Sequence, residues 1–366
     1  MWTILHYLTP SMSLANKLVV TTLKDLTPYQ SARRIGGTGQ IYLNANESAF
    51  PPYQMPEQET WNRYPDFLPA ELAKAYSRYA DVSPDNVLAV RGADEAIDLL
   101  IRTYCEPHRD AIRIQSPTYS MYEFVAQAHG VAVETVPLDN QFALNVAANQ
   151  QAAADQKRLK IVFICNPNNP TGNLMAVSDI VRIAEAQRDR AFVVVDEAYI
   201  EYTPSDTLLP LLSEHPNLVI IRTLSKAFAL AAIRVGFIIA AEEVLAQINK
   251  LIPPYPMPDD SARIGINALS DPGIEYMRSC CERVIALREQ ARKELIPLDA
   301  IEQVYDSTTN FLLVRFKKVS DAMKHLLNAG VVIRDQTHFE QLPQHLRISV
   351  GVSEDMQETL NHLRRL

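Results

Sequence analysis

The sequence predicts an α/β fold: a mostly parallel central sheet covered by helices, followed by a smaller α+β domain. Three short runs are apolar throughout and rich in β-branched residues, namely Ile161–Cys165, Phe192–Val195 and Leu218–Ile221. Such runs are typical of parallel strands that are covered on both faces. The stretches between them have helical periodicity, as in Ser178–Arg188, and fit right-handed crossover connections. Strands and helices therefore alternate as they do in an open α/β sheet.

A strand followed directly by a helix is also predicted earlier in the chain. Val87–Val90 is an apolar run, and Asp94–Tyr104 follows it after a short turn. The second stretch places Ile97, Leu100 and Tyr104 on one face, as an amphipathic helix does.

A cluster of prolines in Ile252–Pro258 predicts the junction between two domains, because proline cannot continue a helix or a strand interior. We divide the chain into residues 1–25 as an N-terminal extension or arm, 26–52 as a segment joining the small domain, 53–253 as the large domain and 254–366 as the small C-terminal domain. The elements expected in the small domain are the helix Gly273–Leu295, the strand Asn310–Phe316, the helix Ser320–Ala329 and the strands Val331–Arg334 and Leu346–Val350.

Composition excludes several classes of function. The 366 residues include 35 basic and 43 acidic ones, without a basic run, so a nucleic-acid partner is not expected. The four cysteines form no C-x-x-C pair and the eight histidines have no metal-ligand spacing, which favours reduced thiols in a metal-free, cytoplasmic enzyme. No basic residue precedes the apolar segment Met1–Leu8, so neither a signal peptide nor a membrane helix is expected. Met12 is an alternative start.

Polar residues follow each of the three buried runs. The first leads into NPNNPTG (Asn166–Gly172), the second into DEAY (Asp196–Tyr199) and the third into RTLSK (Arg222–Lys226). In open α/β sheets, ligands bind beyond the carboxyl ends of the strands. An amide, a carboxylate and an amine are therefore expected to meet at one place.

These groups match the needs of pyridoxal phosphate. The cofactor requires a lysine amine that condenses with its aldehyde, and Lys226 follows a strand on a turn. Its pyridine nitrogen must stay protonated for the ring to withdraw electrons, and Asp196 at a strand end is suited to this. Asn169 and Tyr199 supply neutral donors for the ring oxygen.

The cofactor phosphate also has candidate donors. The backbone N–H groups of Gly92–Asp94 lie where a strand gives way to a helix, which is a favourable place for an anion, provided that the carboxylate of Asp94 points elsewhere. Ser225 and Arg234 add a hydroxyl and a guanidinium.

Each feature alone has a simpler explanation. NPNNPTG is a turn-forming sequence, an aspartate after a strand is more often a helix cap, and an isolated lysine is usually a solvated charge. Tyr119 and Tyr64 taken singly are more often packing residues. Their occurrence together, in order and at the ends of neighbouring strands, favours a cofactor site.

Several stretches match known motifs: LTPYQSARR (Leu26–Arg34), LNANE (Leu43–Glu47), RYPD (Arg63–Asp66), RGADEAIDLLIR (Arg91–Arg102), SPTYSMY (Ser116–Tyr122), NPNNPTG, DEAYIEY (Asp196–Tyr202), RTLSKAFALAAIRVGF (Arg222–Phe237), IRDQ (Ile333–Gln336) and LRISVG (Leu346–Gly351). Through them the chain resembles the fold-type-I aminotransferases from Leu26 onward. LTPYQSARR and IRDQ narrow the resemblance to the histidinol-phosphate aminotransferase group. The chain departs from the family pattern at Ala232, where a glycine is expected.

The resemblance implies a role for each matching residue. Lys226 carries pyridoxal 5'-phosphate as a Schiff base and moves the proton, Asp196 pairs with the pyridine nitrogen, Asn169 and Tyr199 bind the ring oxygen, and Tyr119 stacks on the ring. The cofactor phosphate is bound by Ala93, Asp94, Ser225 and Arg234, and by Tyr64 of a second copy in a homodimer with shared active sites.

The resemblance also implies the substrates. Tyr29, Asn169, Arg334 and Arg347 bind L-histidinol phosphate, whose dianionic phosphate is matched better by two arginines than by one. The implied reaction interconverts L-histidinol phosphate and 2-oxoglutarate with imidazole acetol phosphate and L-glutamate by ping-pong chemistry, in histidine biosynthesis.

Two alternatives remain open. A related enzyme acting on aromatic amino acids or threonine phosphate has the same fold, and Arg334 argues in part against aromatic substrates, which carry no second anion. A non-catalytic ligand sensor on this fold is the other, and the presence of both Lys226 and Asp196 argues against it.

Overall fold

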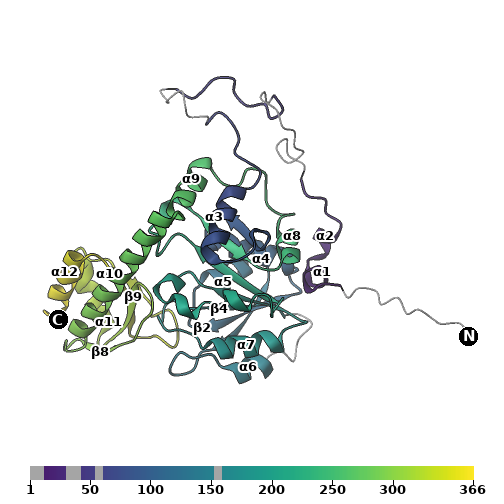
Figure 1. The fold of residues 1–366 in the computed structure, drawn as a ribbon. Coiled ribbons are helices and arrows are strands. Elements are labelled where there is room, and N and C mark those ends of the chain that lie inside the picture. Colours follow the sequence, from purple (N-terminus) through teal and green to yellow (C-terminus); the bar gives the residue numbers. More distant parts are fainter. Residues whose placement is uncertain (1–11, 30–42, 54–60, 152–158) are drawn as a thin grey trace, which may run out of the picture.

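The structure is a computed structural model that describes residues 12–29, 43–53, 61–151 and 159–366 (Figure 1). The beginning of the predicted N-terminal extension and the end of the LTPYQSARR motif lie outside these residues. In the described part, two short helices, α1 (Leu14–Leu18) and α2 (Thr21–Lys24), precede the large domain.

A seven-stranded sheet forms the centre of the large domain, in the order β1-β7-β6-β5-β4-β2-β3. Six strands run in one direction, and β7 runs antiparallel to both of its neighbours. The strands are β1 (Val87–Val90), β2 (Ala111–Ser116), β3 (Ala132–Pro137), β4 (Leu159–Cys165), β5 (Phe192–Asp196), β6 (Leu218–Thr223) and β7 (Gly236–Ile239). The prediction of a mostly parallel α/β sheet is confirmed.

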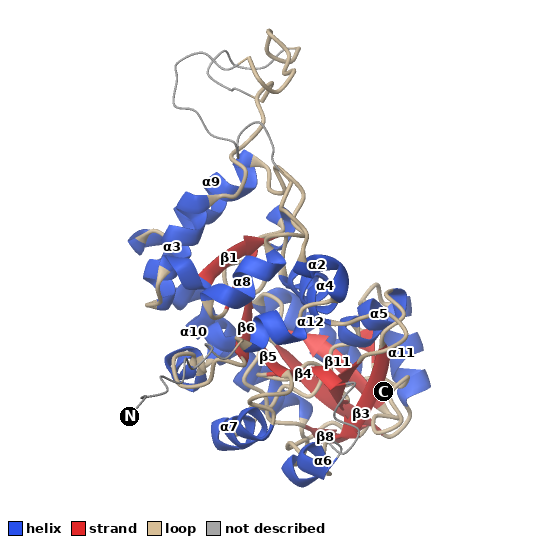
Figure 2. Ribbon diagram, turned by 90° about the vertical axis from the view of Figure 1, so that its right-hand side faces the viewer, coloured by secondary structure: helices blue, strands red, loops and turns tan. Residues whose placement is uncertain are grey.

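Helices cover both faces of this sheet, as Figures 1 and 2 show. Along β4, Val162 and Ile164 pack into one hydrophobic cluster, whereas Ile161 and Phe163 pack into the other. Burial on both faces explains why the central strands are continuous apolar runs. The large-domain helices are α3 (Ala70–Ala80), α4 (Ala93–Tyr104), α5 (Met121–Ala128), α6 (Val146–Gln151), α7 (Val177–Ala186) and α8 (Glu242–Ile248).

A separate four-stranded antiparallel sheet forms the small domain, in the order β10-β11-β9-β8. Its strands and the C-terminal helices are β8 (Ile301–Val304), β9 (Phe311–Phe316), β10 (Arg334–Asp335), β11 (His345–Ser349), α9 (Asp259–Ala268), α10 (Asp271–Leu295), α11 (Val319–Asn328) and α12 (Ser353–Leu363). Helix α9 lies after the predicted junction but contacts α3 of the large domain, and the long helix α10 then leads to the small sheet (Figure 1).

The predicted strand Val331–Arg334 is wrong except for its last residue. The backbone N–H of Val331 donates to Leu326 O and closes the end of α11, where Gly330 has a φ of +79°. Residues after a helix end are used for capping before the chain can pair with a strand. Strand β10 therefore begins only at Arg334.

Strand β7 was not predicted, because it is short and begins with a glycine. A Cβ atom on Gly236 would lie 2.6 Å from the carbonyl carbon of Gly92. The absence of a side chain allows β7 to pass directly beside the start of α4.

Candidate active site

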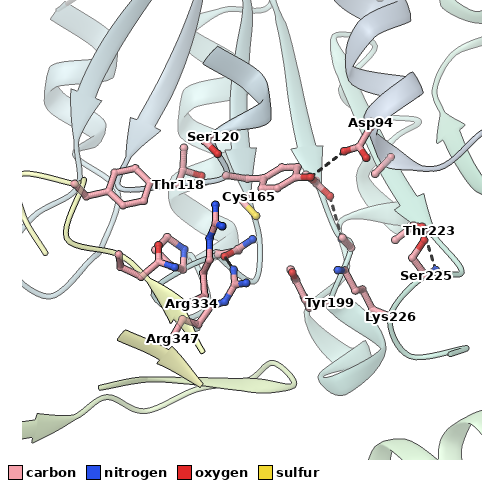
Figure 3. Close-up of a pocket in the computed structure, with 18 of the residues that line it drawn as sticks. Asp94, Thr118, Ser120, Cys165, Tyr199, Thr223, Ser225, Lys226, Arg334 and Arg347 are labelled. Atoms are coloured by element: carbon pink, nitrogen blue, oxygen red, sulfur yellow. Dashed lines mark hydrogen bonds between the residues drawn. The ribbon is translucent and has the colours of Figure 1, made fainter. Parts of the chain in front are cut away.

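A pocket of about 330 Å³ lies beyond the carboxyl ends of the central strands, and both domains line it (Figure 3). All but two of the predicted site residues line this pocket: Ala93, Asp94, Tyr119, Asn169, Asp196, Tyr199, Ser225, Lys226, Arg234, Arg334 and Arg347. The prediction that an amide, a carboxylate and an amine meet at the strand ends is confirmed.

The register of the sheet explains this convergence. Cys165 at the end of β4 pairs with Asp196, and Asp196 pairs with Ile221 of β6. The three strands therefore end at nearly the same level. The turns that follow them bring Asn169 and Lys226 to the two sides of Asp196.

Asp196 is a buried carboxylate, with 2% of its surface exposed. Burial raises its pKa to about 6, and hydrogen bonds from the Tyr122 hydroxyl and the Ala198 backbone N–H oppose the rise. A buried carboxylate with a raised pKa is well placed to gain from a cationic ring nitrogen.

Lys226 lines the pocket opposite the small domain, with its Nζ 5.6 Å from the centre of the Tyr199 ring (Figure 3). Desolvation by the surrounding protein lowers the pKa of its amine, and the positive charge of Arg347 lowers it further. Both effects favour the neutral amine, which is the form that attacks an aldehyde.

The start of α4 is a candidate anion site. Gly92 has a φ of +85°, and a Cβ atom there would lie 2.8 Å from Nη2 of Arg234, so the position requires glycine. No side chain in the described chain caps this helix, because its N-cap residue is Gly92; the nearby Glu95 instead accepts from the backbone N–H of Arg91 at 2.5 Å. The first N–H groups of α4 therefore remain available to an anion.

Four side chains surround this helix start, namely Asp94, Tyr119, Arg234 and Ser225. Asp94 accepts a hydrogen bond from the Tyr119 hydroxyl at 2.9 Å and lies 3.3 Å from Nη2 of Arg234. The Ser225 hydroxyl is held by Thr223 at 2.9 Å. The carboxylate of Asp94 is thus occupied by Tyr119 and Arg234, which reduces its repulsion of an anion.

The small domain contributes two adjacent arginines, Arg334 and Arg347, which pair directly across β10 and β11 (Figure 3). Arg347 donates to Oδ1 of Asn169, and its buried Nε has no partner among the described residues. Burial lowers the pKa of Arg347, and the charge of Arg334 acts in the same direction. In the described ranges neither arginine forms an ion pair with a carboxylate, so the pair is suited to an anionic ligand.

Tyr29 and Tyr64 are the two predicted site residues that do not line the pocket of their own chain. The Tyr64 ring stacks on Tyr255 at 4.5 Å and is half exposed, and Tyr29 is more exposed still.

Sequence reasoning missed several pocket residues. Gln336, His338 and Phe339 follow β10 in the small domain, and Cys165 ends β4. It also missed Tyr122, which bonds Asp196 from beneath the pocket at 2.7 Å. The signal for it was its place in the SPTYSMY motif, three residues after Tyr119 and in the first turn of α5.

The described residues contain no group of three or more His, Cys, Asp or Glu side chains placed to hold a metal ion. Nor does any helix in those ranges have the length and apolar character needed to cross a membrane.

A family model for class I and II aminotransferases matches residues 38–363. The chain belongs to the class I and II aminotransferases. A histidinol-phosphate aminotransferase of Shigella sonnei is 45% identical over 93% of this chain and 95% of its own length. The histidinol-phosphate aminotransferase of Escherichia coli K12 has the same identity and coverage.

Solved structures agree with this family membership. A histidinol-phosphate aminotransferase from Clostridium acetobutylicum has a TM-score of 0.76 and 27% identity, with 83% of this chain and 90% of that chain covered. A second, from Sinorhizobium meliloti in complex with pyridoxal-5'-phosphate, has a TM-score of 0.74 and 24% identity, with 83% and 82% covered. The latter shows a shared fold.

Proposed function

We propose that this protein is a pyridoxal 5'-phosphate-dependent transaminase that interconverts L-histidinol phosphate and 2-oxoglutarate with imidazole acetol phosphate and L-glutamate, in histidine biosynthesis. The observation that carries the proposal is the pair Arg334 and Arg347, which form no ion pair with a carboxylate among the described residues and line one pocket with Lys226. Relatives named histidinol-phosphate aminotransferase, 45% identical over nearly the whole chain, support it.

The large-domain half of the pocket fits the cofactor. When bound, pyridoxal 5'-phosphate supplies an electron sink for the carbanion formed at the amino-acid Cα. Asp196 would pair with the ring nitrogen, and the buried side chains Asn169 and Tyr199 would donate to the ring oxygen. Tyr119 would contact the ring face.

The start of α4 would hold the cofactor phosphate, through the N–H groups of Ala93 and Asp94 together with Ser225 and Arg234. Gly92 supports this role, because a Cβ atom there would lie 2.8 Å from Nη2 of Arg234 and would displace this guanidinium from the helix start.

Lys226 would remove the proton from the substrate Cα and return it to the cofactor carbon C4′. Its lowered pKa supports this task, since a general base works best when its pKa is near the working pH. Tyr199 lies beside it and would limit the directions in which the amine moves.

Arg334 and Arg347 would bind the phosphate of histidinol phosphate. Tyr29 does not line the pocket of its own chain, so its hydroxyl would have to come from the second copy of the homodimer. In the other half-reaction Arg347 would hold a carboxylate of glutamate, with Asn169 as its bonded neighbour. A phosphate dianion satisfies both guanidinium groups, whereas a neutral aromatic side chain leaves both without an anionic partner.

A purified protein supplied with 2-oxoglutarate tests the proposal. We expect turnover with L-histidinol phosphate to exceed turnover with L-histidinol or L-phenylalanine by at least about 100-fold in kcat/KM, because a charge-assisted phosphate contact is lost in the last two. Equal or higher kcat/KM with phenylalanine would replace the proposal by an aromatic-amino-acid transaminase. Release of carbon dioxide from threonine phosphate would replace it by a decarboxylase.

Borohydride reduction tests the cofactor attachment separately. The reduced phosphopyridoxyl group should be found on the peptide that contains Lys226, and a label on another lysine contradicts the assignment.

The proposal includes a cytoplasmic homodimer with shared active sites. Exposed apolar side chains on the segment before α3, Leu43, Phe50 and Tyr53, support a partner surface, and Tyr64 lies outside the pocket of its own chain. Mixed dimers of Lys226→Ala and Tyr64→Ala subunits should regain activity, because one of their two sites then has both residues. No gain on mixing would argue against the shared site.

A further inference from the structure

The carboxylate of Asp196 is held by a buried tyrosine that has no part in the function described so far. The hydroxyl of Tyr122 donates to Oδ2 of Asp196 at 2.7 Å, and the backbone N–H of Ala198 donates to Oδ1 at 3.1 Å. Each carboxylate oxygen can accept two hydrogen bonds, so Asp196 keeps the capacity to accept another from the pocket.

The Tyr122 side chain has little freedom to turn away. It is fully buried, and its ring stacks on Phe163 with centroids 4.7 Å apart and an interplanar angle of 7°. The ring of Tyr119 meets it edge-on at 5.7 Å. Helix α5 therefore fixes the hydroxyl beneath the carboxylate, while the preceding turn presents Tyr119 to the pocket.

The electrostatic surroundings of Asp196 show what the hydrogen bond from Tyr122 does to its carboxylate. Burial raises the pKa of Asp196, and the neighbouring Asp94 adds to the rise, whereas the bond from Tyr122 and the charge of Lys226 lower it. Burial also raises the pKa of Tyr122 and of the adjacent thiol of Cys165. Both groups are therefore neutral, and Tyr122 acts as the donor.

We propose that Tyr122 is a positioning residue that holds the Asp196 carboxylate ionised and directed at the ring nitrogen of the cofactor. The inference rests on the proposed function, because it requires a pyridine ring in the pocket. Tyr122 acts through Asp196 and touches neither the substrate nor the cofactor.

The test measures binding of pyridoxamine phosphate, which does not bond covalently to Lys226, and of its analogue with a C–H group in place of the ring nitrogen. Tyr122→Phe keeps the buried ring and removes the hydroxyl. We expect the variant to bind pyridoxamine phosphate about tenfold more weakly, which is the scale of one hydrogen bond to a charged group. Binding of the analogue should stay unchanged, since it cannot pair with Asp196.

Tyr104→Phe is the matched control. Tyr104 is equally buried and donates to the backbone carbonyl of Val244 at 2.9 Å, away from the pocket. Its substitution should leave the affinity for both ligands as in the unmodified protein. If Tyr122→Phe weakens both ligands equally, Tyr122 is only structural; if it weakens neither, the bond has no effect on Asp196. Either result overturns the inference.

Failure of the cofactor assignment has a different outcome, since the unmodified protein then binds neither ligand, and failure of the substrate assignment shows in the kcat/KM comparison instead. If Tyr122→Phe does not fold, 3-fluorotyrosine at this position is the second variant. Its more acidic hydroxyl donates a stronger hydrogen bond, so pyridoxamine phosphate should bind more tightly and the analogue equally well. Unchanged binding of both ligands again overturns the inference.

Discussion

In the large domain, Asp94, Asp196 and Ser225 are already bonded to protein, whereas the two arginines of the small domain have no carboxylate partner in the described chain. Asp196 accepts hydrogen bonds from Tyr122 and Ala198, and Ser225 is held by Thr223. Arg334 and Arg347 lie side by side with like charges. Those polar groups of the large-domain half therefore have protein partners, whereas the small-domain half carries uncompensated positive charge.

The difference corresponds to two kinds of ligand. A cofactor that remains bound is stabilised best by side chains that are already ordered, because no free energy is then needed to order them in each catalytic cycle. A substrate that dissociates after each turnover must instead be bound by groups that are free to form new contacts each time. Two adjacent guanidinium groups repel each other until an anion arrives, so they select for charge.

The largest effect is expected from Lys226→Ala, which removes the reacting amine. Transamination should fall by about 10⁴-fold, the upper range for a general acid–base group. Lys317→Ala, on the small domain outside the pocket, is the control. Activity within about tenfold of that of the unmodified protein would show that Lys226 is not the reacting amine.

Arg347→Ala should have the next largest effect. Its guanidinium is partly buried, and truncation leaves Asn169 without its bonded partner. We expect kcat/KM for histidinol phosphate to fall by about 100-fold or more, since loss of a desolvated charge contact costs 2–5 kcal/mol. Arg315→Ala, which removes an arginine of the same sheet that pairs with Glu302, should change kcat/KM little.

Asp196→Asn should stabilise the cofactor-free protein at pH 7.5. The folded-state pKa of about 6 lies above the ordinary value of 3.8, so folding favours the protonated carboxyl. The stability this provides is present below about pH 4 and is lost as the pH rises through 6. The asparagine variant should therefore be more stable by roughly 3 kcal/mol at pH 7.5, and the difference should vanish below pH 4.

Thermal unfolding at a series of pH values measures this difference. The order of stability should reverse when pyridoxal 5'-phosphate is bound, because a cationic ring nitrogen then compensates the aspartate. A cofactor-free asparagine variant that is less stable at pH 7.5 contradicts the prediction.

Arg334→Ala should have the smallest effect, about tenfold in kcat/KM for histidinol phosphate, because this arginine is exposed and its charge is partly screened by solvent. The loss should be confined to phosphorylated substrates. An equal loss with L-histidinol would mean that Arg334 contributes to the pocket through packing instead of charge.

Much of the central sheet could be predicted from local sequence patterns. The runs that became β4, β5 and β6 are apolar on both faces, and a polar motif begins where each strand ends, so the pattern alone predicted both the strands and the meeting of Asn169, Asp196 and Lys226. The order and direction of the strands could not be predicted in the same way. The antiparallel β7 depends on a close approach between Gly236 and Gly92 that the sequence does not state.

The sequence by itself determined the fold class and the types of group at the strand ends, because hydrophobic periodicity and turn chemistry are local properties of the chain. Only the tertiary structure decided that Arg334 lies beside Arg347 and that Tyr122 lies beneath Asp196. Both contacts join residues far apart in sequence, and their existence depends on strand register and on the packing of buried rings.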